Sequence, residues 1–464
     1  MVERRKLLVI GLDSAPPRLV FDELRQRIPN ISRLMEEGAY GIMESCHPPI
    51  TIPAWMVMMT GKSPGKLGLY GFRHRKGPSY NEGWIASSES VREPKIWDIL
   101  GRAGRKTCLV GVPPGFPPTA LEGCQVSCFI TPGPEKEYTF PSGLKSEIES
   151  LVGRYLFDVT FRTEDRDTLL KELYEMTEKR FRVIKHLMKT KPWDLFMFVE
   201  IGVDRLHHAF WKFYDKEHPK YVAGNPYERV IPDYYEYIDH QIGELLSLID
   251  EDTSVLVVSD HGTKGMRGAF CINQWLNQEG YLFLKEKPQK VKDLDKASVD
   301  WSKTKAWGWG GYYARIFLNV EGRESDGIVK RSQYDDVRKE LTSRLLSVRD
   351  PDGRLMATRV YKPEELYGKF IGDAPDLMVY FDDLFWRSAG TLGHSSLYLS
   401  ENDTGPDDSV HAVEGIFILR DPRNRKGRNI GKISIYEVAP TLLNLMGESP
   451  GEGMEGKVRG DILC

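Results

Sequence analysis

Short apolar runs alternate with amphipathic stretches along this chain. The runs are rich in Val, Ile, Leu and Phe and lie at residues 7–11, 108–112, 195–199, 254–259, 377–381 and 415–419. Segments with helical spacing of apolar residues separate most of them, and the longest such segment covers residues 165–189. Strands that alternate with helices are typical of a parallel sheet covered on both faces. The sequence therefore predicts an α/β protein with a mainly parallel central sheet and helices on both faces.

The segment from residue 273 to residue 373 differs from its surroundings. It is richer in charge, holds a Lys-rich stretch at 285–296, and carries a second αβ pattern at 314–319 and 334–346. A chain of 464 residues is also too long for one minimal core. We therefore expect residues 273–373 to form an inserted smaller α+β subdomain or lid. The core domain would then consist of two parts, residues 1–272 and residues 374–464.

Four of the apolar runs are associated with acidic and imidazole side chains. These are Asp13, Asp204, His208, Asp260 and His261, which follow runs, and His411, which precedes the last run. In open parallel sheets, reactive groups gather outside the carboxyl ends of the strands. A mixture of carboxylates and imidazoles is what zinc-type ions accept as ligands. The sequence therefore predicts one binuclear metal site drawn from four regions of the chain.

Each of these residues also has an ordinary interpretation when it is taken alone. Asp204 and His208 stand four residues apart, which places both on one face of a helical turn, within reach of a single ion. Such a pair is also common on a solvated helix surface. Asp13 could cap a helix, and the Asp260-His261 pair could be a polar strand exit.

Thr51 is the candidate nucleophile. It lies in Pro48-Pro49-Ile50-Thr51-Ile52-Pro53, where prolines on both sides restrict the backbone. A hydroxyl fixed beside a divalent ion can be deprotonated and so activated. The alternative is that the Thr51 hydroxyl caps a helix that runs from Trp55 to Thr60.

Composition restricts the classes of partner. Lys and Arg total 64 and Asp and Glu total 67, which gives a formal net charge of -3. Nucleic acid is therefore not an implied partner. We expect a cytoplasmic protein without a membrane segment, because no apolar run approaches roughly 18 residues and no signal-peptide pattern is present. The six cysteines form no CxxC pair, so free thiols are expected.

Five motifs follow one another along the chain. They are Gly11-Leu12-Asp13, Ile50-Thr51-Ile52-Pro53, Asp204-xxx-His208, Ser259-Asp260-His261-Gly262 and His411-Ala412-Val413-Glu414-Gly415. Together they resemble the alkaline phosphatase superfamily, and the match is closest to its type I phosphodiesterase/nucleotide pyrophosphatase branch. The similarity covers nearly the whole chain, because residues 435–443 also resemble the final helix of that branch. A serine esterase is disfavoured, since the chain has no Gly-x-Ser-x-Gly elbow.

The resemblance implies an alkaline phosphatase-like fold and a role for each motif residue. It implies that one divalent ion is held by Asp13, Thr51, Asp260 and His261, and a second by Asp204, His208 and His411. Zinc is the first choice for both ions and manganese the alternative. The Thr51 oxygen would attack phosphorus in line, and water would then hydrolyse the phospho-threonine. The expected activity is hydrolysis of a phosphodiester or pyrophosphate bond, and a small-molecule phosphoester substrate is expected only from this resemblance.

Other activities stay open at this point. A metal-dependent phosphomonoesterase, a phosphonate hydrolase or a phosphoglycerate mutase-like isomerase is similar in its ligands, although the mutases have Ser where this chain has Thr51. An inactive metal-binding scaffold is the alternative outside enzymes. The oligomeric state does not follow from the sequence.

Substrate binding and the last metal ligand are the points where the chain departs from the branch. The branch usually has an Asn that holds a phosphate oxygen, whereas residues 68–75 here supply Arg73 and Arg75, as a phosphate clamp or as a charged surface turn. His394 competes with His411 as the last ligand. We favour His411 because it leads into the final apolar run, which places His394 at the pocket mouth.

An aromatic, glycine-rich stretch in the inserted region is a further candidate. It is Trp307-Gly308-Trp309-Gly310-Gly311-Tyr312-Tyr313, with Trp307 and Trp309 as the first candidates. Large rings between glycines suit a loop that faces the substrate, and they equally suit the edge of a subdomain core.

Overall fold

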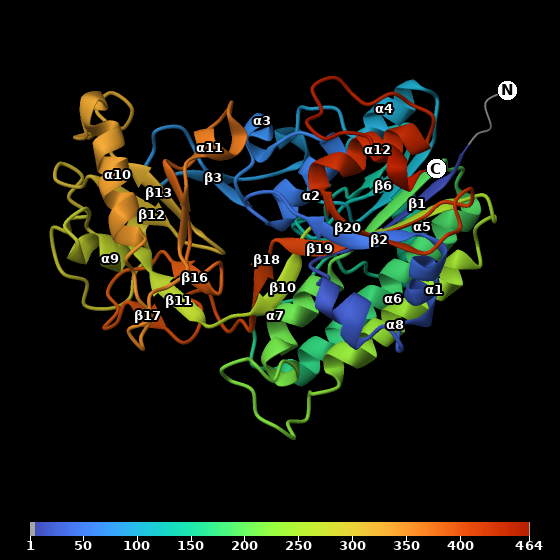
Figure 1. Ribbon diagram of the computed structural model, residues 1–464, viewed down its shortest axis with the longest axis horizontal. Helices are drawn as coiled ribbons and strands as arrows, with labels where there is room; N and C mark the ends of the chain where they lie inside the picture. The colour runs from blue at the N-terminus through green and yellow to red at the C-terminus, as the bar shows by residue number, and fades with distance from the viewer. Residues whose placement is uncertain (1–4, 464) are drawn as a thin grey trace.

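The computed structural model describes residues 5–463 and has a nine-stranded sheet at the centre of its larger body (Figure 1). The strand order is β20-β2-β19-β9-β1-β8-β5-β6-β7. The strands are β20 (Arg428–Ser434), β2 (Ala39–Glu44), β19 (Glu414–Arg420), β9 (Ser254–Val258), β1 (Leu7–Leu12), β8 (Leu195–Glu200), β5 (Thr107–Val110), β6 (Gly123–Val126) and β7 (Thr139–Phe140). Strand β1 runs parallel to both of its neighbours, β8 and β9, whereas β19 and β7 run antiparallel to theirs. The predicted fold class is confirmed.

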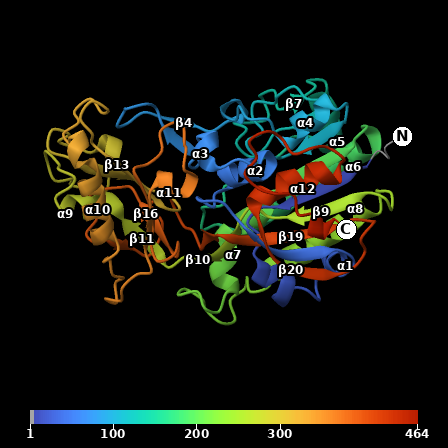
Figure 2. The ribbon, with the colours of Figure 1, turned by 45° about the horizontal axis from the view of Figure 1, so that its top comes forward.

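Helices cover both faces of this sheet. One face carries α1 (Pro29–Glu37), α5 (Leu144–Val152), α6 (Arg166–Thr190), α7 (Gly202–Tyr214) and α8 (Val230–Leu246). The other carries α2 (Thr51–Thr60), α4 (Ile96–Arg102) and α12 (Val438–Leu445), which lie together in Figure 2. Successive side chains of a strand point to opposite faces, so Leu8 packs into the first core and Leu7 into the second.

The long helix expected at residues 165–189 is α6. Asp165 caps it, because its carboxylate accepts a hydrogen bond from the backbone N–H of Thr168. Short elements complete the larger body and its edges: η1 (Arg18–Glu23), α3 (Pro64–Leu67), β3 (Arg73–Arg75), β4 (Gly83–Ile85), η2 (Ser88–Ser90), η5 (Ile435–Glu437) and η6 (Gly460–Ile462).

A smaller body has its own sheets and its own core. One sheet contains β12 (Ala306–Trp309), β13 (Ala314–Leu318), β15 (Leu377–Tyr380) and β14 (Arg359–Tyr361), and the other contains β16 (Trp386–Ala389), β11 (Gly268–Cys271) and β17 (Tyr398–Leu399). Its helices are α9 (Ile272–Gln278), η3 (Leu294–Lys296), η4 (Arg331–Gln333), α10 (Tyr334–Leu345) and α11 (Pro363–Tyr367). The core includes Phe270, Ile316 and Leu377.

The smaller body extends beyond the expected range of 273–373 on both sides. The apolar run at 377–381 is a strand, but it pairs with β13 and β14 rather than joining the central sheet. Strands β11, β16 and β17 also lie outside the expected range. The expected range was based on the charged composition of residues 273–373. The apolar strands on either side of this range do not share that composition, yet they belong to the sheets of the smaller body.

The two bodies meet around a small antiparallel pair of strands, β10 (Gly262–Gly265) and β18 (Ser409–Ala412) (Figure 1). Strand β10 follows the end of β9, and β18 leads into β19, so the chain passes from one body to the other at this place. The carboxyl ends of β1 and β9 therefore lie at the junction.

Two further findings concern cysteines and membranes. Cys46, Cys108, Cys124, Cys128 and Cys271 are free thiols, while Cys464 lies outside the described residues, as does most of the N-terminal stretch inspected for a signal peptide. Within residues 5–463, the helices are all too short or too polar to cross a bilayer.

Candidate metal centre

The first group of candidate ligands forms at the carboxyl ends of β1 and β9. Gly11 pairs with Val258 in register, so Asp13 and Asp260 follow the ends of adjacent parallel strands. Both carboxylates and His261 are completely buried. The Nε2 atom of His261 lies 3.3 Å from Asp260 Oδ2 and 3.7 Å from Asp13 Oδ1. The structure therefore brings these three side chains into one cluster.

Thr51 is the first residue of α2 and is buried beside this cluster. Its Oγ1 atom lies 3.5 Å from His261 Nε2. Ile50 occupies the N-cap position and the Thr51 hydroxyl makes no capping hydrogen bond, so the capping alternative does not hold. The positive end of the α2 dipole lies at this hydroxyl, and it favours negative charge on the oxygen.

The second group comes from α7 and β18. His208 Nε2 lies 3.3 Å from Asp204 Oδ1, and His411 Nε2 lies 3.6 Å from the same oxygen. All three side chains are buried, which excludes the solvated surface pair. His207 points away and contacts Thr263 through Nδ1 at 3.1 Å.

The two groups are continuous with each other. The rings of His261 and His411 stack with centroids 3.8 Å apart. Possible ligand atoms of Asp204, His261 and His411 also lie within 4.8 Å of one another. His261 thus belongs with both groups, whereas His208 contacts Asp204 and Tyr312. The cluster is therefore one buried centre that contains two adjoining sets of candidate ligands.

In each carboxylate of the centre, one oxygen accepts a hydrogen bond and the other oxygen faces the cluster. Trp55 Nε1 donates to Asp13 Oδ2 at 2.8 Å, and Arg205 Nη1 donates to Asp204 Oδ2 at 2.7 Å. A backbone N–H donates to Asp260 Oδ1 at 3.3 Å. The opposite oxygens of these carboxylates have no hydrogen-bond partner among residues 5–463. Buried oxygens without donors fit a bound cation, since an unpartnered buried carboxylate oxygen is costly.

The imidazoles are fixed in the same way. In each ring a hydrogen-bond acceptor lies beside Nδ1, which directs Nε2 into the cluster. The partners are Asp407 Oδ1 for His208 at 2.7 Å, the Gly262 carbonyl for His261 at 3.0 Å, and the Pro49 carbonyl for His411 at 2.9 Å. Such partners set the tautomer of a metal-binding histidine.

The electrostatics of the centre also fit a cation. Burial raises the pKa of Asp13 well above its usual range, and neighbouring Asp204 adds to the increase. Burial raises the pKa of Asp260 in the same way, with Asp13 as the next cause. Burial also lowers the pKa of His261 to about 4, which leaves a neutral imidazole. Crowded carboxylates and neutral imidazoles are stabilised together when a divalent cation binds.

His394, the competing last ligand, lies outside this cluster. It is half-buried, and its Nε2 atom is 2.7 Å from Thr391 Oγ1 on the smaller body. His411 is buried within the cluster instead.

The two candidate arginines take different positions. Arg75 is buried, and its guanidinium pairs with Glu324 at 2.8 Å and with Asp373. These pairs join β3 to the smaller body and occupy the donors that a phosphate clamp would need. Arg73 is exposed on the same strand, and its backbone carbonyl accepts a hydrogen bond from Arg315.

The aromatic stretch reaches the candidate metal centre through Tyr312 and not through its two tryptophans. Trp307 is fully buried and stacks on Phe317, and Trp309 packs edge-on against the same ring, so both belong to the core of the smaller body. Tyr312 reaches the centre instead: its hydroxyl lies 3.1 Å from His208 Nε2. The stretch was expected to face the substrate or to form the edge of a subdomain core, and its residues divide between these two positions.

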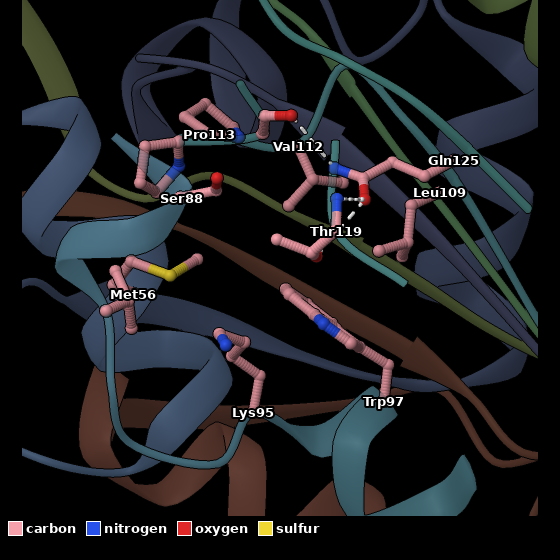
Figure 3. A pocket seen from close by; sticks show the side chains of 12 residues that line it. Met56, Ser88, Lys95, Trp97, Leu109, Val112, Pro113, Thr119 and Gln125 are labelled. Atoms are coloured by element: carbon pink, nitrogen blue, oxygen red, sulfur yellow. Dashed lines mark hydrogen bonds between the residues drawn. The ribbon is translucent and has the colours of Figure 1, made fainter. Parts of the chain in front are cut away.

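A separate small cavity lies behind α2 (Figure 3). It measures about 20 Å³ and is lined by side chains that include Met56, Trp97 and Gln125. This volume suits one water molecule. None of its lining residues belongs to the candidate metal centre, so it is not the place where substrate would bind.

The sheet, the buried threonine at a helix start and the clustered carboxylates and imidazoles define a protein of the alkaline phosphatase superfamily. A family model described as type I phosphodiesterase / nucleotide pyrophosphatase matches residues 7–407. The chain therefore belongs to the type I phosphodiesterase / nucleotide pyrophosphatase family, and it is a metal-dependent hydrolase of phosphoesters.

Solved structures show the same fold at low sequence identity. An inactive variant of murine ectonucleotide pyrophosphatase / phosphodiesterase 5 in complex with AMP matches with a TM-score of 0.58 and 14% identity, over 99% of this chain and 98% of that chain. The human protein of the same name matches with a TM-score of 0.58 and 15% identity, over 99% and 98% of the two chains. No curated protein sequence matches this chain.

Proposed function

We propose that this chain hydrolyses a phosphodiester or pyrophosphate bond, with Thr51 as the nucleophile and two divalent ions as cofactors. The observation that carries the proposal is the position of Thr51 Oγ1, which is buried at the start of α2 and lies 3.5 Å from His261 Nε2. A threonine hydroxyl among unpartnered carboxylate oxygens suits activation by metal ions better than a structural role.

The ligands divide into two sets. Asp13, Thr51, Asp260 and His261 would hold the ion that activates the nucleophile, and Asp204, His208 and His411 would hold the second. We assign His208 to the second set because its Nε2 lies 3.3 Å from Asp204 Oδ1. Mixed nitrogen and oxygen donors favour zinc, with manganese as the alternative.

The ions, when bound, would lower the pKa of the Thr51 hydroxyl and neutralise charge on the phosphoryl oxygens. Thr51 would supply the oxygen that bonds to phosphorus, while the bond from phosphorus to the leaving oxygen breaks and that oxygen takes up a proton from solvent. In the second half, the oxygen of a water molecule bonds to phosphorus, and the Thr51 oxygen leaves and regains its proton. The α2 dipole would stabilise the Thr51 oxygen anion in both halves.

Membership of the family supports a phosphoester substrate but does not identify which phosphoester it is. One structural neighbour was solved in complex with AMP, which makes a nucleotide phosphoester a reasonable first substrate to test. A phosphomonoester, a phosphonate or a mutase-type isomerisation would fit the same ligands. We place the activity in the cytoplasm and on small molecules.

A panel of p-nitrophenyl phosphomonoesters, phosphodiesters and phosphonates, assayed with added Zn²⁺ or Mn²⁺, tests the proposal. We expect turnover of the diester to exceed that of the monoester. If protein that contains both ions turns over none of these substrates, the chain is better explained as an inactive metal-binding scaffold. A strong preference for the monoester would replace the diesterase assignment.

A further inference from the structure

Tyr312 connects the smaller body to the candidate metal centre of the larger one. Its ring stacks on His411 with centroids 3.7 Å apart, and its hydroxyl lies 3.1 Å from His208 Nε2. Both imidazoles belong to the ligand set that we propose for the second ion. The residue lies between β12 and β13, and so the contact crosses between bodies.

The backbone around Tyr312 is held firmly. Gly311 and Ser388 exchange two backbone hydrogen bonds, of 2.8 and 2.9 Å. Gly311 has a φ of 143°, in the region that favours glycine, and a Cβ atom at Gly310 would collide with the Ser388 carbonyl. Tyr313 anchors the other side by donating to the Tyr70 carbonyl at 2.6 Å. These contacts fix where the Tyr312 side chain projects.

A charged residue sets the orientation of the ring. The guanidinium of Arg387 lies 4.2 Å from the centroid of the Tyr312 ring. Arg387 also donates to Asp407 Oδ2 at 2.7 Å, and the other oxygen of Asp407 is the partner of His208 Nδ1. Tyr312 and His208 are therefore positioned through one shared set of contacts.

The hydroxyl of Tyr312 would lose its present partner if His208 bound a metal ion. His208 Nε2 is the atom that would coordinate the ion, and a nitrogen whose lone pair is used in this way no longer takes part in a hydrogen bond with the phenol. The Tyr312 hydroxyl would then be able to donate its proton to another oxygen beside His208 and His411, the two imidazoles that it already contacts.

We infer that the Tyr312 hydroxyl donates a hydrogen bond to a phosphoryl oxygen of the bound substrate. The smaller body thus supplies a substrate-binding residue to the metal centre. The inference rests on the proposed function, because it needs a phosphoryl group at this place. A role as a metal ligand is disfavoured, since Asp204, His208 and His411 already give the three protein ligands typical of a catalytic zinc site.

Phosphate binding by Tyr312→Phe tests the inference. The substitution removes the hydroxyl and keeps the ring that stacks on His411. Inorganic phosphate is titrated into zinc-loaded protein in a calorimeter, and elemental analysis gives the metal content of the same samples. We expect both ions to be retained and phosphate to bind about 10- to 100-fold more weakly, as for a lost hydrogen bond to a charged group.

Tyr398→Phe is the matched control. The Tyr398 hydroxyl donates to the Arg349 carbonyl, which belongs to the smaller body, and its loss should leave phosphate affinity unchanged. Unchanged phosphate affinity in Tyr312→Phe would overturn the inference. Loss of one ion would also overturn it, because the hydroxyl would then be a metal ligand, as would failure of the zinc-loaded wild-type chain to bind phosphate.

The experiment separates this inference from the proposed function. Phosphate binding requires no attack by Thr51, so it can succeed even when the ester panel shows no turnover. Conversely, turnover with an unaltered phosphate affinity in Tyr312→Phe would retain the function and remove Tyr312 from substrate binding.

Discussion

The indole N–H of Trp55 donates a 2.8 Å hydrogen bond to Oδ2 of Asp13, and so links the helix that carries the nucleophile to a carboxylate of the candidate metal centre. Trp55 stands four residues after Thr51 on α2, which is one helical turn. The same contact directs the other Asp13 oxygen into the cluster. Helix α2 therefore sets the position of the hydroxyl and of a ligand at once.

Trp55→Phe should weaken zinc binding by about 10- to 100-fold, the range for loss of an outer-shell partner of a metal ligand. The Asp13 carboxylate would lose the indole donor that fixes its orientation. Competition with a chromophoric chelator measures the affinity. Trp193→Phe is the control, because its indole donates to the Met188 carbonyl instead, and equal losses in both variants would assign the effect to general destabilisation.

The two ligand sets should lose metal independently. Asp204→Asn should release the second ion and keep the first, while Asp260→Asn should release the ion that activates Thr51. Exhaustive chelation should abolish activity, and elemental analysis should return about two ions per wild-type chain. A single ion per chain, or full activity in excess chelator, would contradict a binuclear centre.

His411→Ala should reduce metal content toward one ion per chain, because its Nε2 faces Asp204 Oδ1 at 3.6 Å. His394→Ala should keep both ions and change KM rather than metal content, since His394 contacts Thr391 on the smaller body. Elemental analysis of the two variants shows which histidine is a ligand of the second ion. The reverse pattern would exchange the roles of these histidines.

The stabilisation that zinc gives should grow as the pH rises. In the metal-free chain, burial and then Asp204 raise the pKa of Asp13, and burial and then Asp13 raise that of Asp260. A folded-state pKa above the unfolded one contributes stability at low pH that is lost as the pH rises through the folded value. Bound zinc removes this loss by replacing the protons.

Melting temperatures with zinc and with chelator, measured at about pH 6 and about pH 8, check this expectation. The difference between the two conditions should be larger at the higher pH. A difference that stays the same or shrinks as the pH rises would contradict the replacement of carboxyl protons by zinc.

Local sequence patterns predicted five of the nine strands of the central sheet, and the class of fold, but missed β2, β6, β7 and β20 and wrongly included the run at 377–381. The apolar runs that became β1, β8 and β9 are buried on both faces, and parallel strands end at one edge. Asp13 and Asp260 were therefore expected to be close if their strands were neighbours, and β1 does pair with β9. The spacing of Asp204 and His208 was informative for the same reason, because helical geometry fixes which side chains share a face.

Local sequence patterns could not predict contacts between segments that lie far apart in the chain. Tyr312 contacts His208 across 104 positions, and Asp407 contacts it across 199. Both contacts depend on how the smaller body packs against the larger one. Arg75 illustrates the converse, because a basic residue near the nucleophile looked free to bind phosphate until its acidic partners, Glu324 and Asp373, were placed beside it.

The turnover of Thr51→Ala is the most direct test of the central claim. If the Thr51 oxygen attacks phosphorus, turnover of the preferred ester should fall by about three or more orders of magnitude, while metal remains bound by the carboxylates and imidazoles. Thr51→Ser should retain part of the activity, and Thr168→Ala, an exposed position on α6, should match the wild type. Near-normal turnover in Thr51→Ala with both ions bound would contradict the account.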